Sequence, residues 1–186
     1  DVIEEADGVI PIVPVGRPDT FSSFNARERW VCHTRPTASF DSGDLIAMPG
    51  HVSRMLGVKL YLHEAAGFLF NGYNYYFSAG SRYLTDPYLN TDNDGLGPAG
   101  SAFLVYPAEG GQPEESIRLM LFQQAMQDLG ALQKLESLAG RDAVLTLLSQ
   151  GIAAKPGETE EMMNDWWLLD LRRRLNAAIA QAEGAT

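Results

Sequence analysis

The stretch HVSRMLGVKLYLHEAAGFLFNGYNYY, residues 51–76, places a helix pattern directly before a strand pattern. Its first part carries apolar residues near helical spacing, namely Val52, Met55, Leu56, Leu60 and Leu62. This spacing predicts an amphipathic helix, and Gly67 is expected to end that helix as a C′ glycine. The apolar run FLF, residues 68–70, then predicts a buried strand.

Two short strands are predicted upstream of this helix. The segment GVIPIVPVG, residues 8–16, is apolar and β-branched between glycines, and its two prolines favour a sheet edge or an irregular course. The segment RERWVCHTRP, residues 27–36, has an apolar centre and stops at a proline. The order strand, strand, helix, strand is the alternation expected of a parallel sheet with helical crossovers, so the sequence predicts an α/β fold.

The chain after this region is predicted to become helical. A long polar loop, residues 78–101, and a short strand in AFLVYP, residues 102–107, come first. A helix is then expected from about Pro113 to Ala139, with Glu114 and Glu115 in its first turn. Its expected apolar face consists of Ile117, Leu121, Met126, Leu129 and Leu132.

Two further helices are predicted in RDAVLTLLSQG, residues 141–151, and in residues 159–182, with a linker between them. The last helix carries an apolar stripe of Met163, Trp167, Leu171, Leu175 and Ile179. A stripe with this spacing is typical of packing on a protein body rather than of cofactor binding. We therefore expect a β/α region over residues 1–112 and a helical extension over residues 113–186 that packs on it.

The composition limits the classes of partner. Fourteen Lys and Arg stand against twenty-four Asp and Glu, which gives a net charge of −10 and an isoelectric point near 4.6. This balance opposes binding to nucleic acid and to anionic membrane surfaces, so neither is expected as a partner. The single cysteine, Cys32, leaves the cellular compartment open. The opening residues, which begin at Asp1, resemble neither a signal peptide nor a tag, so we expect a fragment of a longer protein.

Polar and aromatic side chains follow the predicted strands at their carboxyl ends. In parallel sheets and barrels the ligand site gathers at these ends. Phenols and amides that both stack and hydrogen-bond suit a sugar ring, which has apolar faces edged by hydroxyl groups. The alternative is that the tyrosines simply finish a strand under a polar loop. The candidate sugar-contacting residues are Trp30, His33, Asn71, Tyr73, Asn74, Tyr75 and Tyr76.

No metal or cofactor is expected from the remaining motifs. The segment NTDNDG, residues 90–95, matches the first half of an EF-hand loop, but Ser101 stands where the closing Glu should be, so an Asx-rich turn is the better interpretation. The three histidines lack the close spacing of a zinc motif. Cys32 and His33 are adjacent strand residues that point to opposite faces, which disfavours a thiol nucleophile.

The order of motifs resembles the carboxy-terminal region of glycoside hydrolase family 123 and its DUF4091 relatives. RERWVCHTRP resembles the family's Trp-Val-Tyr strand, and SRMLGVKLYLHEAAGFLFNGYN resembles its arginine-led helix followed by an aromatic, Asn-bearing strand end. GSAFLVYPAEGGQPEESIRLMLFQQAMQDLGALQKL resembles the family stretch that ends in a long helix, with Ser116 and Arg118 in matching positions. The resemblance runs from about Glu28 to Leu138.

The resemblance implies the last three or four strands of a (β/α)8-type barrel, with crossover helices, followed by a helical extension. It also implies a retaining, substrate-assisted β-N-acetylgalactosaminidase-like hydrolase, with a carbohydrate as partner. Asn71 and residues 73–76 would then line the sugar pocket at the end of the final barrel strand. In the family an Asp-Glu pair orients the substrate's acetamido group and supplies the general acid and base.

The chain departs from this pattern in its catalytic residues. No Asp-Glu dipeptide occurs in the 186 residues, so no catalytic residue is assigned and the fragment alone is predicted to be inactive. The first alternative is a non-catalytic module that binds glycan or packs structurally. The second is an interaction protein that uses the helix WWLLDLRRRL, residues 166–175, which requires Trp166 or Trp167 to be exposed. A partial barrel is also expected to pack on a missing N-terminal part or to self-associate through its open edge.

Overall fold

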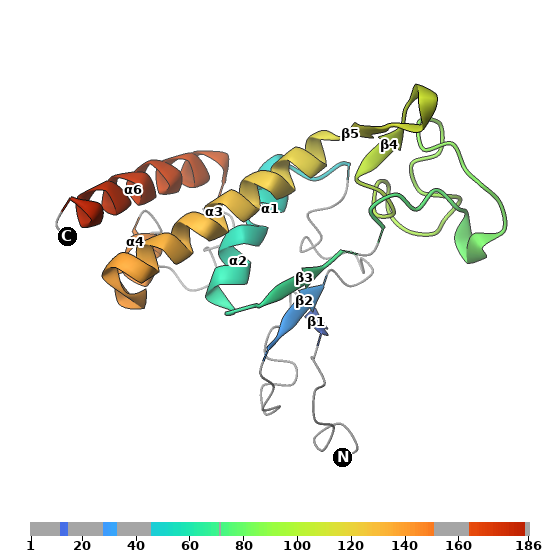
Figure 1. Ribbon diagram of the computed structural model, residues 1–186. Coiled ribbons are helices and arrows are strands. Elements are labelled where there is room, and N and C mark those ends of the chain that lie inside the picture. The colour runs from blue at the N-terminus through green and yellow to red at the C-terminus, as the bar shows by residue number, and fades with distance from the viewer. Residues whose placement is uncertain (1–11, 15–27, 33–45, 71, 151–163, 185–186) are drawn as a thin grey trace, which may run out of the picture.

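The computed structural model describes residues 12–14, 28–32, 46–70, 72–150 and 164–184. Five short strands and five α-helices are found in these residues, together with two 3-10 helices (Figure 1). The strands are β1 (Ile12–Pro14), β2 (Trp30–Cys32), β3 (Gly67–Leu69), β4 (Val105–Pro107) and β5 (Pro113–Glu115). The helices are α1 (Gly50–Arg54), α2 (Leu56–Leu62), η1 (Ala79–Ser81), η2 (Glu109–Gly111), α3 (Ile117–Ala139), α4 (Arg141–Ser149) and α6 (Asp165–Glu183).

The first three strands form a parallel sheet in the order β1-β2-β3. In its register Val13 lies opposite Val31, and Val31 lies opposite Phe68. Helices α1 and α2 connect β2 to β3, and this parallel pairing across a helical connection agrees with the alternation expected from the sequence. The sheet is one layer, and α1, α2 and α3 form a second layer beside it (Figure 1).

One face of the sheet belongs to the hydrophobic core. Val31 is buried, and Phe68 packs with it against Leu56 of α2 and Phe122 of α3. Because neighbouring strand residues point to opposite faces, Leu69 lies on the other face of the sheet. Leu69 is 43% exposed, and Ile12, on the same face, is also 43% exposed, so this second face presents apolar side chains that are partly open to solvent.

The crossover helix ends earlier than the sequence predicted. Its residues form α1 and α2, separated at Met55, and α2 ends at Leu62 rather than at Gly67. Gly67 instead begins β3. A Cβ atom at Gly67 would lie 2.5 Å from the Trp30 ring, so the glycine is required there for contact between strands and not as a helix cap.

The start of the long helix α3 also differs from the prediction. The segment Pro113–Glu115 was expected to form the first turn, but it is strand β5 and pairs antiparallel with β4. The helix begins after Ser116, whose side chain accepts a hydrogen bond from the backbone N–H of Leu119 at 3.3 Å. The predicted end at Ala139 is correct.

The predicted apolar face of α3 is confirmed in part, because Leu129 packs against the core and Leu121 is partly buried. Ile117 and Met126 are exposed, whereas Leu132 is buried as expected. The buried face includes Arg118 and Asp128, which hydrogen-bond to other elements and so carry a charged group into the packed face. An apolar-residue pattern could not find Arg118 and Asp128, because both are charged.

The last described helix, α6, packs through the predicted stripe. Trp167, Leu171 and Leu175 are buried in one core cluster, and Ile179 packs partly buried against it. Met163 lies outside the described residues. Trp166, which is 79% exposed, points away from this cluster. Among the helices that the structure describes, none is both long enough and apolar enough to cross a membrane.

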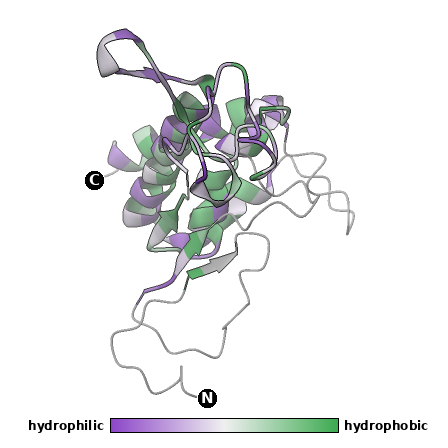
Figure 2. Ribbon diagram, turned by 90° about the vertical axis from the view of Figure 1, so that its right-hand side faces the viewer, coloured by the Kyte–Doolittle hydropathy of each residue, from purple (hydrophilic) through white to green (hydrophobic). Residues whose placement is uncertain are grey.

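Two core clusters meet on α2. Met55, at the junction of α1 and α2, and Val58 join the cluster formed with α3, α4 and α6, whereas Leu56 and Leu60 join the cluster under the sheet. Leu129 of α3 packs against both clusters. In Figure 2 the helices carry both hydrophobic and hydrophilic residues, as expected of amphipathic helices that cover a core.

Candidate functional site

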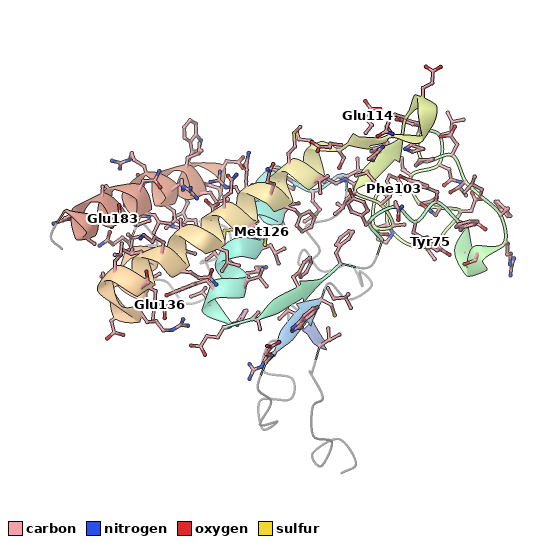
Figure 3. All side chains as sticks on the ribbon, viewed as in Figure 1. Tyr75, Phe103, Glu114, Met126, Glu136 and Glu183 are labelled. Carbon is pink, nitrogen blue, oxygen red and sulfur yellow. The ribbon has the colours of Figure 1, made fainter. Side chains whose placement is uncertain are left out.

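The chain beyond β3 leaves the parallel sheet and forms an antiparallel ribbon with the segment before β4. The backbone N–H of Leu104 donates to the Tyr73 carbonyl at 2.8 Å, and the N–H of Tyr75 donates to the Ala102 carbonyl at 3.1 Å. Asn74 forms an isolated bridge with Phe103. These contacts fix the polar, aromatic end of the strand at the edge of the irregular region on the right of Figure 3, where Tyr75 and Phe103 are labelled.

Two of the candidate tyrosines are tied into this region by their own hydroxyl groups. The Tyr76 hydroxyl donates to the Val105 carbonyl at 2.8 Å, and burial raises the pKa of this phenol. The Tyr75 hydroxyl lies 2.5 Å from the Ser81 hydroxyl oxygen. Tyr75 and Tyr76 therefore hold the loop in place, which is the alternative that the sequence left open for tyrosines at this position.

The other two candidates in this segment face solvent. Tyr73 and Asn74 are exposed, and both follow the parallel strand β3, which ends at Leu69. Asn93 supports the backbone next to them, because its buried side-chain amide donates to the Tyr75 and Phe77 carbonyls at 3.0 Å each. An uncharged amide and a phenol are thus presented on a braced backbone.

The remaining candidates are not brought to this place. Trp30 is the first residue of β2 and pairs with Gly67, the first residue of β3, so it lies at the opposite end of the strands from Tyr73. Its indole Nε1 is buried and has no hydrogen-bond partner among the described residues. His33 and Asn71 lie outside the described residues.

The NTDNDG segment forms the Asx-rich turn that the sequence predicted. The Asp94 backbone N–H donates to the Asn90 side-chain oxygen at 3.1 Å, and the Asn90 side-chain amide donates to the Asp94 carboxylate. Asn93 and Asp94 both have positive φ angles, which Asn and Asp tolerate better than most residues. In the part of the chain that the structure describes, no group of three or more His, Cys, Asp or Glu residues is placed to hold a metal ion.

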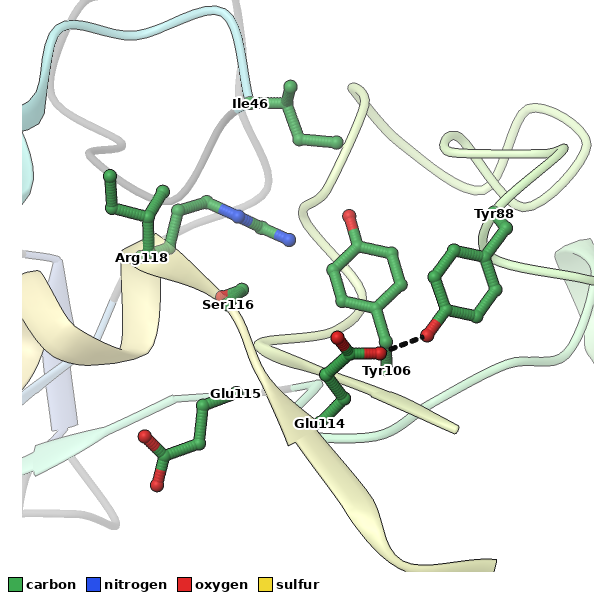
Figure 4. A pocket seen from close by; sticks show the side chains of 8 residues that line it. Ile46, Tyr88, Tyr106, Glu114, Glu115, Ser116 and Arg118 are labelled. Atoms are coloured by element: carbon green, nitrogen blue, oxygen red, sulfur yellow. Dashed lines mark hydrogen bonds between the residues drawn. The ribbon is translucent and has the colours of Figure 1, made fainter. Parts of the chain in front are cut away.

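A cavity of about 340 Å³ lies between the long loop, the β4–β5 hairpin and the start of α3 (Figure 4). We call it the hairpin cavity. Its lining residues are Ile46, Tyr88, Tyr106, Glu114, Glu115, Ser116, Ile117 and Arg118. No sequence pattern singles out Tyr88 and Tyr106, and Glu114 matches only the pattern of a first helical turn. These residues come from segments far apart in the sequence, so only the length of the loop at residues 78–101 pointed toward them.

Two polar features of the hairpin cavity are fixed by contacts: the hydrogen-bonded pair Tyr88 and Glu114, and the guanidinium group of Arg118. The Tyr88 hydroxyl donates to a Glu114 carboxylate oxygen at 2.8 Å, and this hydrogen bond is the main cause that raises the pKa of Tyr88 to about 12. Arg118 is 5% exposed; its guanidinium donates to the Gly100 carbonyl and lies 5.5 Å from the centre of the Phe103 ring. The cavity thus combines phenol rings, carboxylates and a restrained guanidinium.

The hairpin cavity and the exposed end of β3 share one supporting ribbon. The backbone N–H of Val105 donates to the Tyr73 carbonyl at 3.3 Å, and Tyr106 follows Val105 in the chain. Tyr106 also packs edge-on against Phe103, with 5.2 Å between ring centres. One short segment, residues 103–106, therefore connects the two places where polar and aromatic groups are presented.

Comparison with protein families identifies the region that contains these sites. A protein-family model described as "Glycoside hydrolase 123, catalytic domain" matches residues 23–135, which is more than half of the 186 residues. The matched range contains β2, β3, the loop, the β4–β5 hairpin and most of α3. No curated protein matches the chain.

Proposed function

Because the chain belongs to the family defined by the glycoside hydrolase 123 catalytic domain, we propose that it is the carboxy-terminal, sugar-contacting part of a retaining β-N-acetylgalactosaminidase-like enzyme. Membership of this family indicates a glycoside hydrolase-like function and a carbohydrate as the class of substrate. The sugar, the linkage and the substrate-assisted mechanism are part of the proposal.

The observation that carries the proposal is the exposed, braced pair Tyr73 and Asn74 after β3. Ligands of parallel α/β folds bind beyond the carboxyl ends of the strands, and the proposal is supported by the position of this pair in the chain, a few residues after the end of β3. A phenol ring can lie against the apolar face of a sugar, and an amide can both donate to and accept from its hydroxyl groups. We expect Tyr75 and Tyr76 to act on the sugar only through the backbone that they hold in place.

In the proposed enzyme the catalytic Asp-Glu pair lies outside these 186 residues. In the proposed reaction the acetamido oxygen of the substrate attacks the anomeric carbon, and the glycosidic C–O bond breaks as a Glu protonates the leaving oxygen. Water then opens the cyclic intermediate after the same Glu takes its proton. No Asp-Glu dipeptide occurs in this chain, so we expect the 186 residues alone to be inactive.

We also propose that β1, β2 and β3 belong to a (β/α)8-type barrel. Parallel order, short strands and, among the described residues, helices packed on one face are consistent with a barrel wall, whose other face points to a filled interior. The half-exposed side chains of Ile12 and Leu69 support this proposal, because apolar residues exposed on a sheet face are usually buried by further structure. The cover would be further strands of the same enzyme, or a second copy of the chain at the open edge.

Two other functions remain as alternatives. A non-catalytic glycan-binding or structural module is favoured by the missing Asp-Glu pair. An interaction protein is favoured by Trp166, whose exposure meets the condition set by the sequence, although Trp167 is buried. Neither alternative needs a catalytic acid, so hydrolysis separates them from the proposed enzyme.

The test is a release assay with aryl β-N-acetylgalactosaminide and related aryl glycosides, run on the longer protein and on the 186-residue chain. We expect activity in the longer protein alone, and a reduction of about tenfold or more in kcat/KM for Asn74→Ala. Asn176→Ala is the matched control, because Asn176 is exposed on α6, far along the chain from the site. No release by either protein, with the fold verified, would favour a non-catalytic module.

A further inference from the structure

The hairpin cavity has an aromatic wall built from two elements. The rings of Tyr88 and Tyr106 lie 4.9 Å apart, centre to centre, with 37° between their planes. Tyr106 is backed by Phe103, so its position is set by the β4–β5 hairpin and by the buried core behind it. Figure 4 shows both tyrosines beside Glu114, with Ile46 and Arg118 across the cavity. The two rings are packed against each other at a tilt, so the pair presents its outer ring surface and ring edges to a ligand as an apolar patch.

Polar groups border this aromatic wall. Glu114 uses one carboxylate oxygen to accept from Tyr88, and a carboxylate has further acceptor positions for ligand hydroxyl groups. Ser116 accepts from the backbone N–H of Leu119, which leaves its hydroxyl hydrogen to donate. Acceptors and a donor therefore stand next to the apolar patch.

The excess of negative charge in the cavity disfavours the binding of anions. Glu114 and Glu115 stand against the single cation Arg118 among the lining residues, in a chain of net charge −10. The Arg118 guanidinium is also held by the Gly100 carbonyl and the Phe103 ring. A neutral ligand with hydroxyl groups and one apolar face fits this combination better than a phosphate or a carboxylate.

From these observations we infer that the hairpin cavity is a second sugar-binding site, which takes a neutral pyranose ring of a glycan against Tyr88 and Tyr106 with Glu114 as hydrogen-bond acceptor. The choice of a sugar as ligand class rests on the proposed function. The site itself is separate from the one proposed at Tyr73 and Asn74.

The Tyr88 hydroxyl strengthens this arrangement at ordinary pH. Its pKa of about 12 keeps it protonated, so it continues to donate to Glu114 and holds the carboxylate beside the rings. Tyr83 offers a matched comparison in the same loop, because its hydroxyl donates to Asp94 at 2.6 Å and it is 54% exposed, against 53% for Tyr88. Tyr83 does not line the hairpin cavity.

The experiment is amide chemical-shift mapping on the ¹⁵N-labelled 186-residue chain with methyl β-glycosides of galactose, glucose, N-acetylgalactosamine and N-acetylglucosamine. At least one glycoside is expected to cause saturable shifts at Tyr106 and Ser116, in addition to any shifts at Tyr73 and Asn74. Tyr88→Ala is expected to weaken binding at Tyr106 about tenfold, whereas Tyr83→Ala leaves it unchanged.

Two further variants separate loss of contact from loss of structure. Tyr88→Phe keeps the ring and loses the hydrogen bond to Glu114, so binding is expected to fall by only a few fold. Glu114→Gln is expected to weaken binding severalfold, because it replaces a charged acceptor by a neutral one. Glu109→Gln, an exposed carboxylate of the same hairpin outside the cavity, is expected to change nothing.

Three outcomes would overturn the inference. The first is that no glycoside shifts the amides at Tyr106 and Ser116 up to its solubility limit. The second is that Tyr88→Ala and Glu114→Gln bind as tightly as the parent chain. The third is that the cavity binds tetramethylammonium but no glycoside, since aromatic rings beside a carboxylate also suit an organic cation.

These results are independent of the hydrolysis assay. Sugar binding at Tyr106 without hydrolysis by the longer protein would support the second site and count against the enzyme. Hydrolysis with glycoside shifts confined to Tyr73 and Asn74 would support the enzyme and overturn the second site.

Discussion

At the scale of single residues, the Tyr88–Glu114 hydrogen bond has a measurable signature in the ionisation of the phenol. The bond stabilises the protonated phenol and raises the pKa of Tyr88 from its ordinary value of 10 to about 12. Glu114→Gln is expected to return this pKa toward 10, because the charged acceptor is removed. The measurement is a tyrosinate absorbance titration of the variant and the parent, compared as a difference.

A matched carboxylate makes this titration specific. Glu115 is the neighbouring residue, and it is not among the groups that perturb Tyr88, so Glu115→Gln should leave the titration unchanged. Since the folded pKa is raised, the bond contributes stability that is fully present below about pH 10 and is lost as the pH rises through about 12. A titration of Glu114→Gln identical to that of the parent would contradict the assignment of the hydrogen bond.

At the residue scale the sequence predicts where the polar aromatic cluster lies but not what each of its side chains contacts. It placed the polar aromatic cluster after the correct strand, because composition and position along the chain are local properties. It could not tell Tyr73, which is exposed, from Tyr76, whose hydroxyl bonds the Val105 carbonyl, because the partner lies far along the chain. Tyr88 and Tyr106 were missed for the same reason, since their pairing depends on a folded hairpin.

At the scale of elements, two helical glycines provide a matched pair of substitutions. A Cβ atom at Gly57 of α2 would lie 2.0 Å from the Ala125 carbonyl oxygen of α3, so Gly57→Ala must push the two helices apart. Gly130 of α3 has no atom within 4 Å of its Cβ position. We expect Gly57→Ala to destabilise the protein by about 3 kcal/mol and Gly130→Ala to stabilise it by about 0.5–1 kcal/mol.

Chemical denaturation followed by circular dichroism measures both changes on the same scale. Equal effects of the two substitutions would show that helix propensity, rather than the close contact between α2 and α3, governs Gly57.

A buried carboxylate joins three helices. Asp128 of α3 accepts from Arg54 of α1 at 2.7 and 3.2 Å, and from Arg172 of α6 at 2.9 Å. Asp128→Ala removes the shared anion and leaves two guanidinium groups without it, so we expect a loss of about 3–5 kcal/mol in unfolding free energy.

The control for this substitution is Asp170→Ala on α6. Asp170 also accepts from two arginines, Arg173 and Arg174, but it lies at the surface, where such pairs contribute under about 1 kcal/mol. Denaturant midpoints of the two variants give the comparison, and similar losses for both would contradict a special role for the buried group.

The errors at this scale have a common cause. The acidic residues before α3 match the composition of a first helical turn, but their pairing with β4 brings them into a strand. Likewise, the buried face of α3 includes Asp128 because two arginines from other helices reach it. Local patterns predicted that these elements exist, whereas their boundaries and faces depended on partners distant in the sequence.

At the scale of the whole molecule, the two core clusters should unfold together. Residues at the start of α2 and within it contribute to both clusters, and Leu129 packs against each. In a variant that carries Trp166→Phe and Trp167→Phe, Trp30 is the remaining tryptophan and reports on the sheet. We expect its fluorescence and the far-ultraviolet circular dichroism of the helices to change at the same denaturant concentration.

The opposite outcome has a clear meaning. A Trp30 transition at lower denaturant would show that the sheet opens while the helices persist. The α/β order of the described part followed from the sequence, because it depends on strand and helix periodicities. Closure into a barrel stays a prediction, since the described residues supply three parallel strands and a barrel requires more.

The hydrogen bond between the Leu104 N–H and the Tyr73 carbonyl has a consequence for the evolution of the chain. It holds the two ends of the segment between Tyr73 and Leu104 side by side, so the position of both ends is fixed. Changes of length inside such a segment cost little, because the entropy of closing a loop grows slowly with its size. Insertions and deletions there can reshape the wall that carries Tyr88 while the helices and the sheet keep their packing, which makes this segment a natural place for related proteins to diverge in the ligands they accept.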